Sequence, residues 1–183
     1  MSDSIWMATL AAFRDRLASI EPVPAGVTAA AVSATLALAL LSKVLQVTRN
    51  HKDFAGDGDL MDTLLEDARN TSMTLSQLAD DDVAAFREYL DCMRSKQPTG
   101  AALRKTIEVP LNIARTASFG ITLCEKAAGH VHKVVAPDLG IAAGLLAGAV
   151  RSTLVTVNSN LEQLPEHDPY RLEAAAETGR LSI

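Results

Sequence analysis

The segment from Val27 to Leu41 constrains the fold more than any other, because about 15 residues pass there without a charged side chain. A helix that spans a membrane needs about 20 consecutive apolar residues, so this run is short for a span. It also contains three hydroxyl side chains, and its many alanines are only mildly hydrophobic. A helix that is apolar on most sides is typical of the centre of a bundle. We therefore predict a central core helix over about residues 28–49, with Thr28 at or near its N-cap.

The composition favours closely packed helices and excludes two classes of partner. Apolar residues make up 48% of the 183 residues but aromatic residues only 4%, and strands prefer aromatic and β-branched side chains. A net charge of -5 argues against a nucleic-acid partner. Because no cluster of basic residues stands out, we also expect no membrane partner.

The two cysteines, Cys92 and Cys124, are too few for a disulfide framework. The chain opens without a basic segment followed by an apolar one, so we expect no secretory signal and a cytoplasmic location. Cys124 would act as a nucleophile only with a base beside it. A small buried apolar residue is the simpler interpretation.

Apolar residues recur at helical spacing along the whole chain, and prolines and glycines separate the periodic segments. The consecutive aspartates Asp80 to Asp82 suit a helix start, where the positive end of the helix dipole favours carboxylates. We expect one all-α domain over residues 1–183, an up-and-down helical bundle of six to seven helices. The predicted helices cover about residues 3–20, 28–49, 60–78, 80–93, 101–130 and 137–161, and a polar C-terminal tail with one more turn or helix begins near residue 165.

Two features inside the predicted helices carry structural expectations. Pro110 lies within the helix over residues 101–130 and should kink it, because proline has no N–H to donate. Gly140, Gly144 and Gly148 lie four residues apart, which places them on one helix face. We expect a neighbouring helix to approach that face closely.

Six short motifs follow one another in a fixed order between about residues 5 and 165. They comprise Pro22, Pro24, Gly26 and Thr48; Lys52 and Phe54; Asp80, Asp82, Ala85 and Phe86; Val109, Pro110 and Leu111; Asp138, Gly140 and Ala142; and Asn160 with Leu161. Together they resemble the cyclodeaminase/cyclohydrolase family, small tetrahydrofolate enzymes that also occur as the C-terminal domain of formiminotransferase-cyclodeaminase. The chain departs from that pattern where Ala25 and Val27 replace two turn glycines, Pro137 replaces a serine and Thr156 replaces an asparagine.

The resemblance implies a methenyltetrahydrofolate cyclohydrolase, which hydrolyses 5,10-methenyltetrahydrofolate to 10-formyltetrahydrofolate. It equally implies the related cyclodeaminase, which expels ammonia from 5-formiminotetrahydrofolate. Neither reaction needs a metal or redox cofactor, so a tetrahydrofolate derivative is expected as substrate and no cofactor beside it. The resemblance also implies a homodimer with its pocket near the subunit interface. A non-catalytic helical homodimer that binds folate or another small molecule, and a purely structural helical partner, are the alternatives that the replaced glycines favour.

Asp138, Asp82 and Lys52 are the candidate catalytic residues. Asp138 stands alone in an apolar segment, where burial would raise its pKa, and is the candidate proton-moving or charge-pairing carboxylate. A helix N-cap alone is the alternative, and capping is also compatible with a role in the site. Asp82 precedes Phe86 by four residues and is expected to face inward, whereas a solvated helix start is the alternative. Lys52 is either a pairing or proton-moving group at the mouth of a loop or an ordinary surface lysine.

The candidate substrate-binding residues come from two regions. Pro24, Gly26 and Thr28 belong to a turn before a helix, whose free N–H groups can bind a carboxylate of a glutamate tail; plain capping is the alternative. Arg151 and Asn160 fall on the helix predicted over residues 137–161, within reach of the same groove, or serve as surface and structural residues. His130 and His132 lack a third ligand nearby, so we predict no metal site.

Overall fold

The computed structural model describes residues 4–182, and this part of the chain consists of helices and their connections, without a strand. The first residue of the helix predicted over 3–20, and both ends of the domain predicted over 1–183, lie outside the described residues. A short 3-10 helix, Ile5–Met7, precedes the α-helices. They are α1 (Leu10–Leu17), α2 (Gly26–Arg49), α3 (Gly58–Arg94), α4 (Gly100–Ala127), α5 (Ala136–Leu161) and α6 (Pro169–Leu181).

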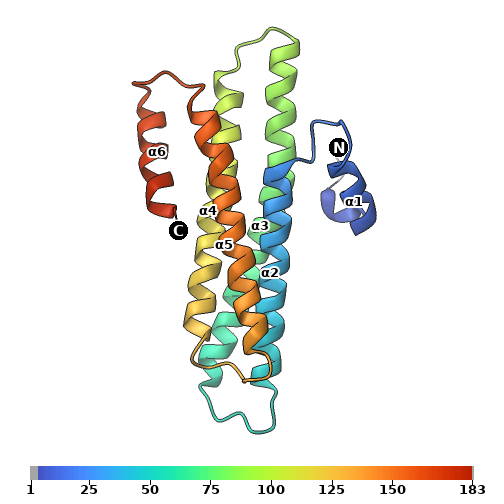
Figure 1. Cartoon of the computed structure of the whole chain (residues 1–183), viewed down its shortest axis with the longest axis vertical. Coiled ribbons are helices and arrows are strands. Elements are labelled where there is room, and N and C mark those ends of the chain that lie inside the picture. Colours follow the sequence, from blue (N-terminus) through green and yellow to red (C-terminus); the bar gives the residue numbers. More distant parts are fainter. Residues whose placement is uncertain (1–3, 183) are drawn as a thin grey trace.

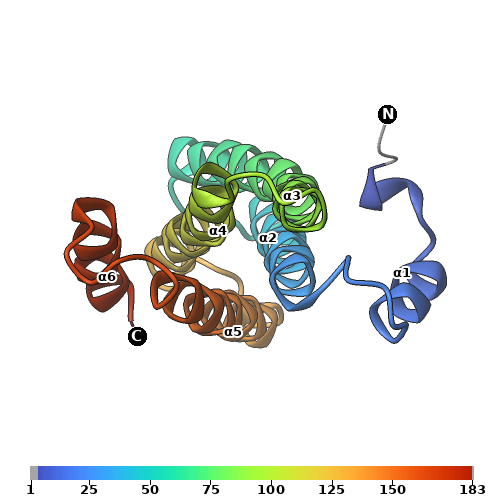
Figure 2. The same ribbon diagram turned by 90° about the horizontal axis from the view of Figure 1, so that it is seen from above.

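Helices α2 to α5 run up and down along the long axis of the molecule and form a four-helix bundle (Figure 1). Seen from the end, these four helices surround one core, with α6 outside α4 and α5 and with α1 on the opposite side of the bundle (Figure 2). The predicted all-α, up-and-down bundle is confirmed, with six α-helices in the described part of the chain.

The uncharged segment forms most of α2 and lies in the core, as predicted: Leu38, Leu41 and Val44 are fully buried. By length and composition alone, both α2 and α5 would be long and apolar enough to cross a membrane, but a buried bundle helix meets the same description. In the most apolar stretch of 18 residues in each helix, 61% of the stretch is buried inside the chain for α2 and 39% for α5. Helix α5 therefore carries apolar surface that this single chain does not cover.

Helix α3 continues through the three consecutive aspartates, so the predicted boundary between helices 60–78 and 80–93 is wrong. The buried stripe Leu75, Ala79 and Val83 passes across them without interruption. Within a helix, an aspartate costs about 0.7 kcal/mol or less relative to alanine. Three of them do not end a helix that has no internal proline or glycine and keeps its apolar face buried.

The three aspartates have separate structural roles. The Asp80 carboxylate accepts hydrogen bonds from the hydroxyl of Ser4 at 2.7 Å and from the backbone N–H of Ile5 at 2.8 Å, which anchors the N-terminal segment to α3. Asp81 accepts a hydrogen bond from the side chain of a glutamine one turn earlier. Asp82 faces the interior of the bundle.

The N-terminal helix is shorter than the predicted span of residues 3–20. Thr9 caps α1 with its hydroxyl, which accepts the N–H of Ala12, and the extended backbone at Ala8 separates α1 from the preceding 3-10 turn. No residue of α1 is buried, and Leu10 and Ile20 are largely exposed. Of the apolar stripe in this segment, Phe13 packs against the core, whereas Leu10 and Ile20 do not.

The polar C-terminal tail folds into α6, which two arginines of α4 hold in place. Arg104 donates to the carboxylate of Asp168 at 3.0 Å, directly before α6 begins. Arg115 pairs with Glu177 near the other end of α6. Exposed ion pairs contribute little each, so Ala174 and other buried residues of α6 provide the remaining attachment.

The close approach of helices occurs at Gly120 on α4 rather than at the three glycines of α5. A Cβ atom at Gly140, Gly144 or Gly148 would meet no atom within 4 Å, so the close packing predicted there is wrong within one chain. A Cβ at Gly120 would lie 3.0 Å from Leu146 and 3.3 Å from Leu38, two side chains that are completely buried. Gly120 therefore sets how closely α4 approaches α5 and α2.

The change Gly120→Val should lower the free energy of unfolding by about 1–3 kcal/mol or more, because the added side chain overpacks a closed core. Gly179→Val on α6 is the matched control, since a Cβ at Gly179 meets nothing within 4 Å. Denaturant unfolding monitored by circular dichroism measures both. Equal stability of the two variants would show that Gly120 does not set the helix spacing.

Candidate active site

A cavity of about 220 Å³ lies at the end of the bundle where α2 begins, and all four bundle helices line it. Its lining residues are Val23, Ala25, Gly26 and Val27 at the start of α2, Asp82 and Phe86 on α3, Thr106 on α4, and Thr156 and Asn160 on α5. Asp82 is the single charged residue in this lining. The cavity thus combines one carboxyl group with an aromatic ring, two hydroxyls and an amide.

The start of α2 presents its first N–H groups without a side-chain cap from its own N-cap residue. Helix α2 begins at Gly26 with Ala25 as the N-cap, so Thr28, predicted at or near the N-cap, lies near it as the third residue of the helix. Ala25 has an extended φ of -130°, and no glycine in the described residues has a positive φ. Ala25 and Val27 therefore take the place of glycines without backbone strain. The N–H groups at this end of α2, of which that of Thr28 donates to Asp82, attract anions.

The N-cap residue of α2 offers no side-chain acceptor, and Asp82 on α3 provides one instead. The hydroxyl of Thr28 donates to Asp82 Oδ2 at 2.6 Å. Burial raises the pKa of the Asp82 carboxyl above its ordinary value, and hydrogen bonds from the Thr28 side chain and backbone oppose part of that rise. The predicted inward orientation is confirmed, because Asp82 and Phe86 line one cavity. A carboxyl that holds its proton more tightly than usual is suited to proton transfer near neutral pH.

Asn160 compensates for a hydrogen bond that Pro110 removes from α4. Because proline has no N–H, the carbonyl oxygen of Thr106, four residues earlier, receives no backbone hydrogen bond. Nδ2 of Asn160 donates to that oxygen at 2.9 Å and lies 3.2 Å from Thr106 Oγ1. The side chain of Asn160 therefore joins α5 to α4 and at the same time lines the cavity.

Sequence reasoning does not identify Thr106 or Thr156 as lining residues, and it names Phe86 as a residue of the apolar stripe and of a family motif without assigning it to the site. A signal for Thr106 is present, because a proline inside a helix frees the carbonyl four residues earlier. Thr156 lies four residues before Asn160, hence on the same helix face, but this spacing alone does not mark a cavity.

Asp138 lies away from this cavity, in the first turn of α5. The N-cap of α5 is Val135, so the N-cap position predicted for Asp138 is wrong. Asp138 Oδ2 is 3.4 Å from Nζ of Lys43 on α2, and the Asp138 side chain is 33% exposed. The expectation that apolar side chains enclose Asp138 is therefore wrong, because a lysine and solvent accompany it. A catalytic role for Asp138 stays a prediction.

The two carboxylates lie toward opposite ends of α2. Lys43 follows Thr28 by 15 residues, which at the helical rise of about 1.5 Å per residue separates them by about 22 Å. Because Asp82 contacts Thr28 and Asp138 contacts Lys43, one chain does not bring both carboxylates to one small molecule.

The remaining predicted site residues divide between the cavity and the surface. Gly26 lines the cavity, and Pro24 is buried directly before it. Lys52 is exposed in the loop that follows α2, toward the Asp138 end of the bundle. Arg151 is exposed on α5 and does not belong to the cavity lining. The structure therefore places Gly26, Asp82 and Asn160 together and leaves Lys52 and Arg151 outside.

Two of the histidines tie together the loops at the far end of the bundle. The rings of His51 and His132 stack with centroids 3.9 Å apart and planes 21° apart. The backbone N–H of His132 also donates to Thr48 Oγ1 at 3.0 Å. His51, His130 and His132 all line one cavity of about 280 Å³ at this end of the bundle. Within residues 4–182, no three His, Cys, Asp or Glu side chains are grouped so as to hold a metal ion.

Cys124 is buried, as predicted. Burial raises the pKa of its thiol to about 11, with a smaller contribution from the nearby Glu125 charge. The thiol therefore stays protonated at neutral pH and does not serve as a nucleophile.

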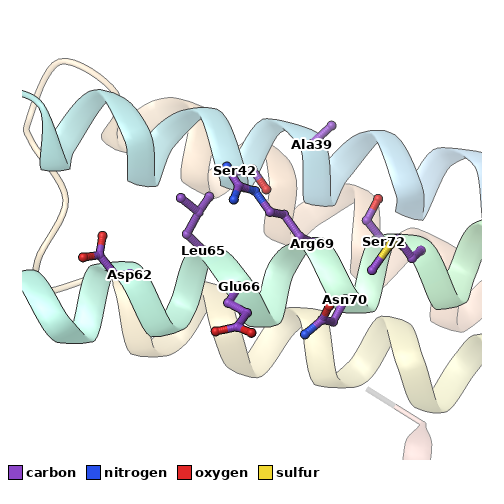
Figure 3. Close-up of a pocket in the computed structure, with 9 residues that line it drawn as sticks. Ala39, Ser42, Asp62, Leu65, Glu66, Arg69, Asn70 and Ser72 are labelled. Carbon is purple, nitrogen blue, oxygen red and sulfur yellow. The ribbon is translucent and has the colours of Figure 1, made fainter.

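A larger cavity, about 890 Å³, is an open groove between α2 and α3 that contains none of the predicted site residues (Figure 3). Glu66 and Asn70 point away from α2, whereas Arg69 extends toward Ser42 (Figure 3). No residue in the lining of this groove comes from the first turn of a helix, so the groove lacks the anion-attracting helix start that the cavity around Asp82 has. We therefore take the smaller cavity around Asp82 as the candidate active site.

The change Asn160→Ala should lower the free energy of unfolding by about 1–3 kcal/mol, because it leaves the buried carbonyl of Thr106 without a donor. The control is Asn158→Ala, which removes an exposed amide from the same helix. Thermal and denaturant unfolding compare the two. If both variants unfold alike, Asn160 does not satisfy the carbonyl that Pro110 leaves free.

Comparison with known proteins gives three consistent results. The sequence model of the formiminotransferase-cyclodeaminase family matches residues 9–178. Methenyltetrahydrofolate cyclohydrolase from Methylorubrum extorquens is 28% identical over 169 residues, which cover 86% of this chain and 81% of that protein. The crystal structure of formiminotetrahydrofolate cyclodeaminase from Thermotoga maritima superimposes with a TM-score of 0.90 and 25% identity, over 97% of this chain and 89% of that one. Because the family match extends over most of its length, this chain belongs to the formiminotransferase-cyclodeaminase family.

Proposed function

We propose that this chain is an enzyme of one-carbon folate metabolism that hydrolyses 5,10-methenyltetrahydrofolate to 10-formyltetrahydrofolate, or that catalyses the related release of ammonia from 5-formiminotetrahydrofolate. The observation that carries the proposal is the Asp82 carboxyl, which lines a cavity at the start of α2 and has a raised pKa. The cyclohydrolase and the cyclodeaminase to which the chain is similar bear the names of these two activities.

In the hydrolysis, water adds to the cationic carbon between N5 and N10 of the substrate. The water oxygen bonds to that carbon and gives up a proton, which we assign to Asp82. The N5–C bond then breaks, N5 takes a proton back from Asp82, and the formyl group stays on N10. The second proton of the water leaves to solvent. One carboxyl thus serves as base and then as acid, which requires a pKa closer to neutrality than that of an ordinary aspartate.

In the alternative reaction, N10 attacks the formimino carbon, and the bond from that carbon to the amino group breaks. We assign to the protonated Asp82 carboxyl the proton that ammonia takes as it leaves, and the proton that N10 loses returns to Asp82. Both reactions move protons and no electrons, so we propose that the enzyme works without a redox cofactor and with the folate as its substrate. The chemistry requires no metal ion either.

The rest of the cavity suits one end of such a substrate. Phe86 offers an aromatic face to a flat ring, and the hydroxyls of Thr106 and Thr156 can exchange hydrogen bonds with its polar edge. Cavities that enclose a drug-sized ligand usually measure about 300–1,000 Å³. With about 220 Å³, this cavity encloses part of a folate and leaves the remainder outside.

We also propose that the enzyme is a homodimer in the cytoplasm, without a nucleic-acid partner. The dimer is supported by the exposed apolar side chains of α2 and α5, among them Leu36, Leu145 and Val155. Both cysteines are free thiols, which agrees with a reducing compartment.

The alternative of a non-catalytic binding homodimer that has lost turnover is not favoured. Its main support was the replacement of two turn glycines, and the turn accepts Ala25 and Val27 without strain. The named relatives are also enzymes.

Asp82→Asn should lower the rate of 5,10-methenyltetrahydrofolate hydrolysis by about 100-fold or more, because an amide does not accept the proton of the attacking water. Loss of the near-ultraviolet band of the substrate measures the rate against buffer. Asp81→Asn is the matched control, since Asp81 is the neighbouring carboxylate and lies outside the cavity. An unchanged rate for Asp82→Asn would remove Asp82 from the mechanism, and a wild-type protein that neither accelerates this reaction nor the cyclodeamination would refute the proposed function.

The same substitution should make the protein more stable at pH 7. The fold raises the pKa of Asp82 above the value of the unfolded chain, so the ionised carboxylate costs stability at neutral pH. That cost disappears as the pH falls below the aspartate pKa of the unfolded chain, about 3.9. Asn keeps an oxygen that can accept from Thr28. Urea unfolding at pH 7 and near pH 4 should therefore show a gain for Asp82→Asn that shrinks in acid; a loss of equal size at both pH values would contradict a raised pKa.

A further inference from the structure

We infer that a second cavity, lined by Arg87 and Arg94 beside the cavity around Asp82, is a subsite that binds the carboxylates of the substrate's glutamate tail. The inference rests on the proposed function and deepens it, because it names the residues that hold the part of the folate that does not react.

The second cavity, which we call the arginine cavity, measures about 310 Å³ and adjoins the cavity around Asp82. Val23, in the segment that leads into α2, lines both cavities. On α3, Phe86 lines the cavity around Asp82, and Leu90, about one helical turn later, lines the arginine cavity. Helix α3 extends past the start of α2 at the top of Figure 1, so a ligand that leaves the first cavity in that direction continues along α3.

One row of side chains on α3 connects the two cavities. The row consists of residues at intervals of four, which form a ridge along a helix: Asp82, Phe86, Leu90 and Arg94. Arg94 follows Asp82 by 12 residues, which at the helical rise separates them by about 18 Å. The row thus passes from a carboxyl through an aromatic ring and an aliphatic side chain to a cation.

The order of these groups matches the order of the parts of a folate. In a folate the reactive carbon between N5 and N10 is followed by the benzoyl ring and then by the glutamate with its carboxylates. With the reactive carbon at Asp82, the benzoyl ring lies toward Phe86 and Leu90. The carboxylates then reach the arginine cavity.

The cavity around Asp82 offers no cation of its own to these carboxylates. Among the described residues, its lining holds no lysine or arginine, and the ionised form of Asp82 repels an anion. The backbone N–H of Thr28, at the start of α2, is already used by Asp82. A cavity of about 220 Å³ also leaves the tail outside. The arginine cavity is the adjoining space that has cations in its lining.

Two arginines suit the two carboxylates of a glutamate. A guanidinium group presents several N–H donors in a planar geometry that matches a carboxylate. Arg87 is half-buried and Arg94 is exposed, about two helical turns apart on α3. Asp91 Oδ1 lies 3.6 Å from Nη1 of Arg94, a contact that keeps the guanidinium at the cavity and engages only one of its nitrogens.

The arginine cavity also contains two carboxylates, Glu21 and Asp91, which distinguish it from a site for a bare anion. Both side chains are exposed, so water and salt weaken their repulsion of a ligand. Each is also an acceptor for the amide N–H that joins the glutamate to the benzoyl ring. The lining therefore suits a ligand that carries both carboxylates and an N–H donor.

Arg94→Gln should raise KM for 5,10-methenyltetrahydrofolate by about tenfold with a smaller change in kcat, because it removes a charged partner of a substrate carboxylate. The diamide of the same substrate keeps the tail but has no carboxylates, and its KM should be the same for Arg94→Gln and the wild type. The matched control is Arg69→Gln, which removes an exposed arginine of the same helix outside both cavities. It should leave KM unchanged for both substrates.

Two further variants separate substrate binding from the ion pair of Arg94 with Asp91. Asp91→Asn breaks that pair but leaves the arginine, so it should not raise KM. Glu21→Gln removes an opposing charge and should lower KM by about twofold. An unchanged KM for Arg94→Gln would overturn the subsite. So would an equal rise in KM for the acid and the diamide, or a rise for Asp91→Asn as large as that for Arg94→Gln.

A binding measurement tests the subsite independently of turnover. The probe is p-aminobenzoylglutamate, the tail of a folate without its pterin, titrated into the protein by isothermal titration calorimetry. It should bind the wild type and Arg69→Gln alike and Arg94→Gln about tenfold more weakly. No binding to the wild type, or equal binding to Arg94→Gln, would overturn the subsite. If the wild type shows no turnover but binds this probe in a manner that depends on Arg94, the proposed function fails while the carboxylate subsite stands.

Discussion

The hydrogen bond between Thr28 and Asp82 is the contact on which both the fold and the proposed chemistry depend. Helix α2 starts at a residue whose side chain provides no cap, so the acceptor comes from α3. This contact fixes the start of the core helix against its neighbour, and it also keeps a carboxylate inside a cavity. Burial disfavours the charged form of that carboxylate, and Thr28 keeps the group in place. A carboxylate that only capped a helix would keep its water at the surface. Here the fold buries the carboxylate and so destabilises its charged form, which suits the proton transfer that we propose for Asp82.

A second exchange of hydrogen bonds forms the opposite wall of the cavity. Pro110 removes one donor from α4, and Asn160 on α5 replaces it at the carbonyl of Thr106. Pro110 and Thr106 on α4 and Asn160 on α5 thus form a contact between the two helices that a regular α4 would not need. Because the Asn160 side chain replaces a backbone donor, it fixes the positions of two lining residues of the cavity. Fixed lining residues help a site to orient its substrate.

The sequence predicts the fold well, because the apolar periodicity and the uncharged core segment admit few arrangements. It fails at boundaries that depend on tertiary packing. The aspartates at 80 to 82 look like a helix start but lie inside α3, since the buried stripe through Val83 outweighs their low helix propensity. Asp82, Gly26 and Asn160, which the sequence marks as candidate site residues, line one cavity in the structure, while their catalytic and binding roles stay predictions. The apolar surroundings of Asp138 in the sequence suggest burial, but neighbours in sequence do not reveal that Lys43 lies across from it. Thr156 is marked in the sequence only as a departure from the family's pattern, which does not reveal that it lines a cavity.

The proposed function requires that the Asp82 carboxyl contacts the substrate and transfers protons to and from it. The most direct measurement is a pH titration of the side-chain carboxyl carbons of ¹³C-labelled aspartates by NMR, with the Asp82 signal identified by its loss in Asp82→Asn. The account predicts that this carbon titrates above the ordinary aspartate value of about 3.9, and that its signal shifts when a stable tetrahydrofolate is added. A carboxyl that titrates at the ordinary value and does not respond to the folate would contradict the account.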